Sequence, residues 1–205
     1  MKNDIKERII KTLQEVHRDG IEDIINYLIT SDFFTAPAST KYHLCREGGL
    51  AEHSLHVYEC LLEKKRLEGG IWKEQLKDIS EESIAVAALL HDLCKTYFYT
   101  VDYRNQKVYS ENGTKTDAKG RYEWESVPYY TVDDKMPLGH GEKSVMLIEK
   151  YMKLTPDEMY AIRWHMGSFE PKENWNMLSS AFTKHPLALA LYMSDLEATY
   201  VIETE

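Results

Sequence analysis

The residues of this sequence that point most directly to chemistry are histidines and aspartates spread over most of the chain. Helical spacing of apolar residues places most of them on helix faces that should point into the core. His53 shares a predicted face with Leu50, for example, and Asp195 lies in the same stripe as Ala188. The full set is His53, His91, Asp92, His140, His165 and Asp195.

A single histidine on an apolar face is more often a hydrogen-bonded core residue, and the pair His91-Asp92 is common by chance. A buried carboxylate without a partner, however, costs on the order of several kcal/mol. A metal would satisfy the whole set, because imidazoles supply neutral lone pairs and carboxylates balance charge. The sequence therefore predicts a site for one or two divalent transition metals. These ligands suit Fe, Mn, Zn, Ni or Co and do not distinguish among them.

Three cations lie close in sequence to the predicted ligands. Lys95 should lie one helical turn past His91, so we expect it to act in catalysis together with Asp92. Lys143 and Arg163 are further candidates to bind substrate, and the alternative for each cation is a solvated surface position. Among the other histidines, His56 fits a solvated helix face or a supporting role, and His43 could reach a pocket.

Composition limits the classes of function. The 205 residues fit one domain, 1–205, and a net charge of −9 argues against a large nucleic-acid surface. A small phosphorylated substrate remains compatible, because a metal supplies positive charge locally. Three scattered cysteines argue against disulfides and thiolate zinc sites. Without a long apolar run or a signal-like start, we expect a cytoplasmic protein; the oligomeric state stays open.

The apolar pattern predicts an all-α fold. Two helices are expected within residues 1–34, followed by a loop over 35–49 and a helix from about 50 to 68. Ser80 should cap a helix that reaches Asp92, and Thr155-Pro156 should begin another. The remaining helices are expected at about 141–152, at 175–182 and from Pro186 onward.

Residues 97–132 differ from the rest because tyrosine, tryptophan and valine alternate with polar turns. This pattern predicts a β-hairpin or small sheet inserted between helices. Its aromatic residues could cover a pocket and stack on a base, or they could serve only to pack the hairpin itself.

Five segments together resemble the HD-domain superfamily of metal-dependent phosphohydrolases over roughly residues 40–200. They are Gly48-Gly49-Leu50-Ala51-Glu52-His53, His91-Asp92-Leu93-Cys94-Lys95, Gly139-His140-Gly141, Trp164-His165-Met166 and Met193-Ser194-Asp195. The first segment and the spacing are similar to the HD module of a bacterial 3′–5′ exoribonuclease family. Residues 1–35 are too short and too helical for the oligonucleotide-binding fold of that family, so its activity is not transferred.

The resemblance implies that His53, His91, Asp92 and Asp195 form the core ligand set. It further implies a binuclear site in which Asp92 bridges two ions and His140 and His165 bind the second. A metal-activated hydroxide would then hydrolyse a phosphomonoester or phosphodiester of a nucleotide or short oligonucleotide. The alternatives are a mixed-valent di-iron oxygenase of the same fold and a nucleotide-binding HD domain without turnover.

Overall fold

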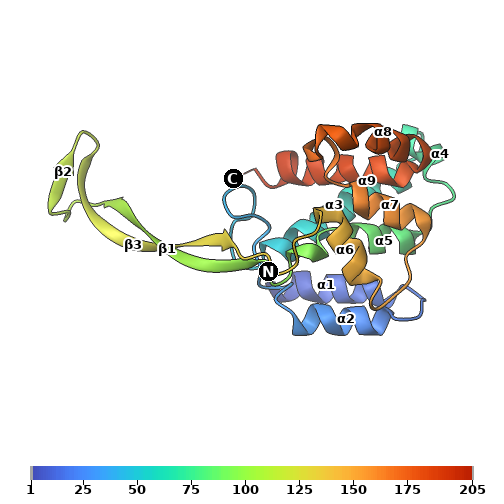
Figure 1. Cartoon of the computed structure of the whole chain (residues 1–205), viewed down its shortest axis with the longest axis horizontal. Helices are drawn as coiled ribbons and strands as arrows, with labels where there is room; N and C mark the ends of the chain where they lie inside the picture. The colour runs from blue at the N-terminus through green and yellow to red at the C-terminus, as the bar shows by residue number, and fades with distance from the viewer. Residues whose placement is uncertain (1, 205) are drawn as a thin grey trace.

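The computed structural model describes residues 2–204 and shows a helical body from which a long β-arm projects (Figure 1). The body contains the predicted helices and the arm is the predicted insertion, so the expected all-α fold with a small inserted sheet is confirmed. Among residues 2–204, no helix is both long enough and apolar enough to cross a bilayer.

The N-terminal helices form one side of the body. They are α1 (Lys2–Gln14) and α2 (Ile21–Thr30), and the predicted break between them lies at Gly20. Gly20 has φ of 87°, and a Cβ added there would lie 1.9 Å from the carbonyl oxygen of Tyr151. Glycine is therefore required both by the turn and by the close approach of the Tyr151 backbone.

Four helices surround the centre of the body. α3 packs against α5 and α9, and α7 packs against the same two helices. Every residue of α5 from Ser83 to Leu90 is buried, which explains why this segment is apolar on all sides. The four helices are α3 (Gly49–Arg66), α5 (Glu81–Leu90), α7 (Pro156–Trp164) and α9 (Pro186–Glu197).

The two predicted helix starts are confirmed by their caps. The Ser80 side chain accepts a hydrogen bond from the backbone N–H of Ser83. Thr155 and Glu158 form a reciprocal capping box at the start of α7. The predicted end of α5 was wrong, because the helix stops at Leu90 and residues 91–92 form a turn before a 3-10 helix.

Shorter elements complete the body. The segment after α3 contains a helix that the sequence reading did not predict, α4. A π-helical turn follows α9 directly. These elements are α4 (Ile71–Gln75), α6 (His140–Ile148) and α8 (Trp175–Lys184), 3-10 helices at Leu93–Lys95, Gly167–Phe169 and Lys172–Asn174, and the π-helix Ala198–Ile202.

The arm is an antiparallel sheet with strand order β1-β3-β2. Its strands are β1 (Tyr99–Tyr109), β2 (Lys115–Asp117) and β3 (Gly120–Val132), with Tyr99 opposite Val132 at the base. The Tyr109 and Tyr122 rings pack against each other, and Lys107 lies over Tyr122. The outer part of the arm extends away from the helices (Figure 1), so its aromatic residues pack the arm and do not cover the body.

A partly buried ion pair joins the N-terminal helices to α7. The Arg18 guanidinium donates hydrogen bonds to both carboxylate oxygens of Glu158, at 2.8 and 2.6 Å. The Glu158 side chain is completely buried, and it also closes the α7 capping box. Arg18 therefore neutralises a charge that fixes the start of α7.

This arrangement predicts a large difference between two arginine substitutions. Arg18→Met should lower the free energy of unfolding by about 3 kcal/mol, because it leaves the Glu158 carboxylate buried without its partner. Arg8→Met removes an exposed ion pair with Glu59 and should cost less than about 1 kcal/mol. Urea denaturation measures both, and equal losses would contradict the structural role of the partly buried pair.

Candidate metal centre

All six histidines and aspartates singled out in the sequence come together in the helical body. Each lies on or directly beside a helix, so the positions of the helices determine the positions of the ligands. They are His53 in α3, His91 and Asp92 after α5, His140 at the start of α6, His165 after α7 and Asp195 in α9.

Asp92 lies at the middle of this cluster. Its Oδ1 accepts a hydrogen bond from His140 Nε2 at 2.7 Å, and its Oδ2 lies 2.7 Å from Lys95 Nζ. The Nε2 atoms of His91 and His165 are each 3.5 Å from one of its oxygens. Burial alone would raise the pKa of Asp92, but Lys95 and the surrounding imidazoles lower it well below its usual value. Asp92 is therefore ionised and can share its two oxygens among several partners.

His53 connects the other carboxylates to this cluster. Its Nε2 lies 3.2 Å from Asp195 Oδ1 and 3.8 Å from Asp92 Oδ2. Its Nδ1 lies 3.1 Å from Glu203 Oε1. Burial lowers the pKa of His53, but the two hydrogen-bonded carboxylates Asp195 and Glu203 outweigh it and raise the pKa to about 10.

His91 and His165 show most clearly that the site fits a metal. The Nδ1 of each ring donates to the carbonyl oxygen three residues earlier, Ala88 at 2.8 Å and Ile162 at 2.7 Å. A carbonyl only accepts, so Nδ1 carries the proton and Nε2 keeps a free lone pair. Both Nε2 atoms are buried without any hydrogen-bond partner. Burial lowers the pKa of His91 to about 4, so this ring is neutral at pH 7.

Burying two imidazole nitrogens without hydrogen-bond partners would destabilise a protein core. A metal ion bound to both nitrogens would remove this cost. The possible donor atoms form overlapping groups within 4.8 Å of one another. Around the predicted ligands these groups are His53/His91/Asp195, His91/Asp92/His165 and Asp92/Cys94/His140. The family resemblance assigns the first group, His53/His91/Asp195, to one ion. Asp92 belongs to the second and third groups.

Glu203 is a functional candidate that the sequence did not predict. Its buried carboxylate accepts hydrogen bonds from His53 Nδ1 and, at 2.8 Å, from His56 Nδ1. The contact fixes the orientation of the His53 ring and directs Nε2 toward the cluster. The sequence allowed His56 either a solvated helix face or a supporting role, and its hydrogen bond to Glu203 gives it the supporting role. Glu203 follows the last predicted helix, and no local pattern in the sequence marks it.

His43 also belongs to the site, although its position in the sequence indicated only that it could reach a pocket. Its ring centroid lies 4.9 Å from that of His53, and its Nε2 is buried without a hydrogen-bond partner. Together with Lys95 it lines a cavity of about 180 Å³ that leads to Asp92 and Asp195. The cavity gives a small ligand access to the cluster.

Cys94 is close to the cluster but is a poor metal ligand. Its Sγ lies 3.4 Å from both ring nitrogens of His140. Burial raises the pKa of this thiol to about 12, so it remains protonated.

The three predicted substrate cations occupy different environments. Lys95 lines the cavity, and its side chain is 13% exposed. Lys143 is buried and forms an ion pair with Asp134 at 2.5 Å, whereas Arg163 pairs with Glu170 at 2.8 Å. Neither Lys143 nor Arg163 is among the residues that line the cavity. Lys95 is thus the one cation of the three that the structure places beside the predicted ligands.

Comparison with protein families gives one match. The family model described as HD domain matches residues 50–201, a span that includes all six predicted ligands. No curated protein and no solved structure matches the chain.

Removal of a central imidazole should abolish metal binding at the cluster. His91→Ala deletes one of the two unpartnered Nε2 donors, and we expect the purified variant to lose its bound transition metal in elemental analysis. His185→Ala is the matched control, because His185 also pairs with a carboxylate, Asp157 at 2.7 Å, but outside the cluster. Retention of full metal content by the His91 variant would contradict the proposed ligand set.

The Glu203 contact makes a separate prediction. Glu203→Gln keeps the side-chain size but weakens the hydrogen bond that this side chain accepts from His53 Nδ1. Metal affinity should therefore fall about tenfold or more. A competition titration against a coloured chelator measures this change. An affinity equal to that of the unaltered protein would show that Glu203 does not support the site.

Proposed function

Because this chain belongs to the HD-domain family, we propose that it is a metal-dependent phosphohydrolase acting on a phosphomonoester or phosphodiester of a nucleotide or short oligonucleotide. The observation that carries the proposal is the pair of buried imidazole nitrogens beside Asp92, which have no hydrogen-bond partner. The pair lies next to a cavity that also contains a lysine.

The metal-binding residues in this proposal are the predicted six, His53, His91, Asp92, His140, His165 and Asp195. When bound, a divalent metal supplies a water of lowered pKa as the nucleophile and polarises the phosphoryl oxygens. Asp92 offers one oxygen to each side of the cluster and is the residue suited to lie between two ions.

Lys95 is the proposed catalytic cation. Its Nζ lies 2.7 Å from Asp92 Oδ2, and its pKa is raised because the Asp92 carboxylate outweighs the effect of burial. The ammonium group is therefore charged at pH 7 and held at the side of the cavity. There it can donate hydrogen bonds to a phosphoryl oxygen as negative charge develops on it. In a chain of net charge −9, such local cations are what attracts a phosphate.

The size of the site agrees with this chemistry. A cavity of about 180 Å³ is smaller than the roughly 300–1,000 Å³ of sites that enclose a whole drug-sized ligand. It can receive a phosphate group, and the remainder of a nucleotide would lie outside it.

The direct test is a screen of phosphomonoesters and phosphodiesters, including nucleotides, with added Mn²⁺ and with elemental analysis of the same protein. Released phosphate or nucleoside would support the proposal. Oxygen consumption by an iron-loaded sample without phosphate release would instead indicate the di-iron oxygenase alternative, and ligand binding without turnover would indicate a non-catalytic domain.

Lys95→Met should leave the metal bound and lower kcat about 100-fold, because it removes a donor directed at the developing charge. Lys135→Met is the matched control, since Lys135 also lies 2.7 Å from an aspartate, Asp133, but outside the cavity. The comparison measures kcat and metal content for both variants on one substrate found in the screen. Equal kcat values for the two would remove Lys95 from the mechanism.

A further inference from the structure

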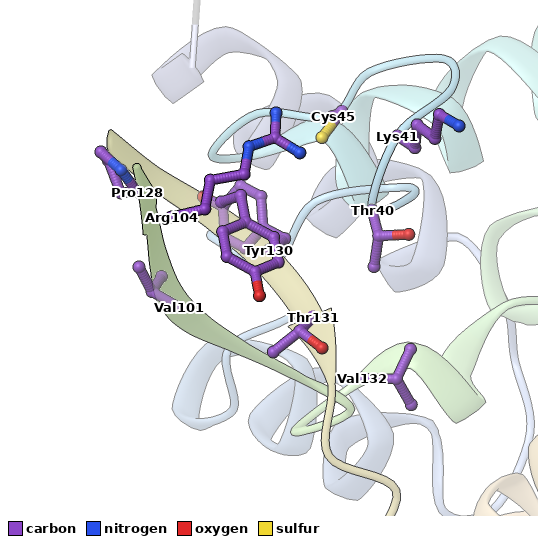
Figure 2. A pocket seen from close by; sticks show the side chains of 10 residues that line it. Thr40, Lys41, Cys45, Val101, Arg104, Pro128, Tyr130, Thr131 and Val132 are labelled. Atoms are coloured by element: carbon purple, nitrogen blue, oxygen red, sulfur yellow. The ribbon is translucent and has the colours of Figure 1, made fainter. Parts of the chain in front are cut away.

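A second, larger hollow lies beside the metal centre, between the base of the β-arm and the loop of residues 39–46. Its volume is about 860 Å³, within the range of sites that hold a nucleotide-sized ligand. We call it the arm cleft, and Figure 2 shows it from close by. The residues that line it include Lys41, Cys45, Arg104, Tyr129 and Tyr130.

The lining of the arm cleft is cationic and aromatic. It contains Arg104 and Lys41 but no carboxylate, although the whole chain carries a net charge of −9. The Arg104 guanidinium donates a long hydrogen bond, 3.5 Å, to Gln106 Oε1. Arg104 extends from β1 across the cleft toward Cys45 (Figure 2), and its guanidinium lies 5.2 Å from the Tyr129 ring centroid.

The loop that separates the arm cleft from the metal centre is internally hydrogen-bonded. The Ser39 hydroxyl donates to the His43 carbonyl at 2.8 Å and accepts from the Tyr42 N–H at 2.9 Å. Leu44 has φ of 43°, a conformation that is uncommon for residues other than glycine. It lies between His43, which lines the metal cavity, and Cys45, which lines the arm cleft. The loop is therefore held in one shape and presents its residues to both sides.

A third cavity, of about 450 Å³, borders both sites. It shares His43 and Tyr200 with the metal cavity, and Lys41 and Cys45 with the arm cleft. A ligand whose phosphate entered the metal cavity would have to continue outside it, because that cavity is small. Through these shared residues the three cavities adjoin one another along the 39–46 loop, from the metal cavity to the cleft that contains Arg104.

We propose that the arm cleft binds a second nucleotide of the substrate, with its phosphate on Arg104 and Lys41 and its base against Tyr130. This inference rests on the proposed function, since it extends the same substrate. A guanidinium matches the geometry of a phosphate and donates to two of its oxygens at once. An aromatic ring stacks on any base without reading its identity, so the cleft favours substrate length and not sequence. The substrate is thus at least a dinucleotide.

Cys45 provides a test that needs no turnover. It is exposed in the arm cleft, whereas Cys60 and Cys94 are buried. Its rate of alkylation by iodoacetamide, followed by mass spectrometry, should fall about tenfold when a 5′-phosphorylated adenine dinucleotide saturates the protein. AMP and inorganic phosphate should protect much less, because they carry one phosphate and can be held in the metal cavity alone. Chromatography checks that the dinucleotide stays intact.

The matched variants are Arg104→Gln and Arg121→Gln, two exposed arginines of the same arm of which only Arg104 lines the cleft. Arg104→Gln should weaken dinucleotide protection about tenfold, and Arg121→Gln should leave it unchanged. Burial raises the pKa of the Cys45 thiol and the Arg104 guanidinium partly opposes this, so each rate is compared with and without ligand in the same variant.

The outcomes separate this inference from the proposed hydrolase activity. Protection by the dinucleotide that depends on Arg104 supports the arm cleft even if no substrate is hydrolysed, and the hydrolase proposal then fails alone. Hydrolysis of the dinucleotide with equal KM values for both variants and no protection of Cys45 overturns the arm cleft and leaves the hydrolase proposal intact. Protection by AMP equal to that by the dinucleotide also overturns it.

Discussion

The structure depends on one electrostatic constraint, the burial of an ionised aspartate among several imidazoles in the same small space. Asp92 is surrounded by His91, His140 and His165 and by the ammonium of Lys95. Hydrogen bonds satisfy part of this group, but two imidazole nitrogens stay without partners. A core made for stability alone would not retain them. The helices that carry the cluster are therefore best understood as a frame that holds metal-binding donors at fixed positions.

The same local hydrogen bond orients the metal-binding Nε2 atoms at two helix ends. α5 and α7 each stop at the residue before a histidine, and that histidine turns its Nδ1 back to a carbonyl of the last helical turn. The hydrogen bond satisfies a carbonyl that the helix leaves open and also fixes the ring tautomer. Each Nε2 is then directed into the cluster. Helix termination thus determines both the fold around the site and its chemistry.

The sequence predicted the parts of the site that depend on local patterns. His53 and Asp195 were found because apolar spacing showed which helix face is buried, and capping residues located the starts of α5 and α7. It did not predict Glu203, and for His43 it predicted only a possible approach to a pocket, because both residues contact His53 only in the folded chain. The ending of α5 at Leu90 was also missed, since the continued apolar run favours a longer helix. The arm was predicted as a small sheet, but its projection from the body is a tertiary property that strand propensity does not contain.

Anomalous diffraction at the metal absorption edge would show whether these side chains surround a metal. For crystals of the metal-loaded protein, we expect one or two anomalous peaks within coordination distance, about 2.0–2.2 Å, of His91 Nε2 and an Asp92 oxygen. Peaks confined to other positions, or none in a sample shown to contain the metal, would contradict the account.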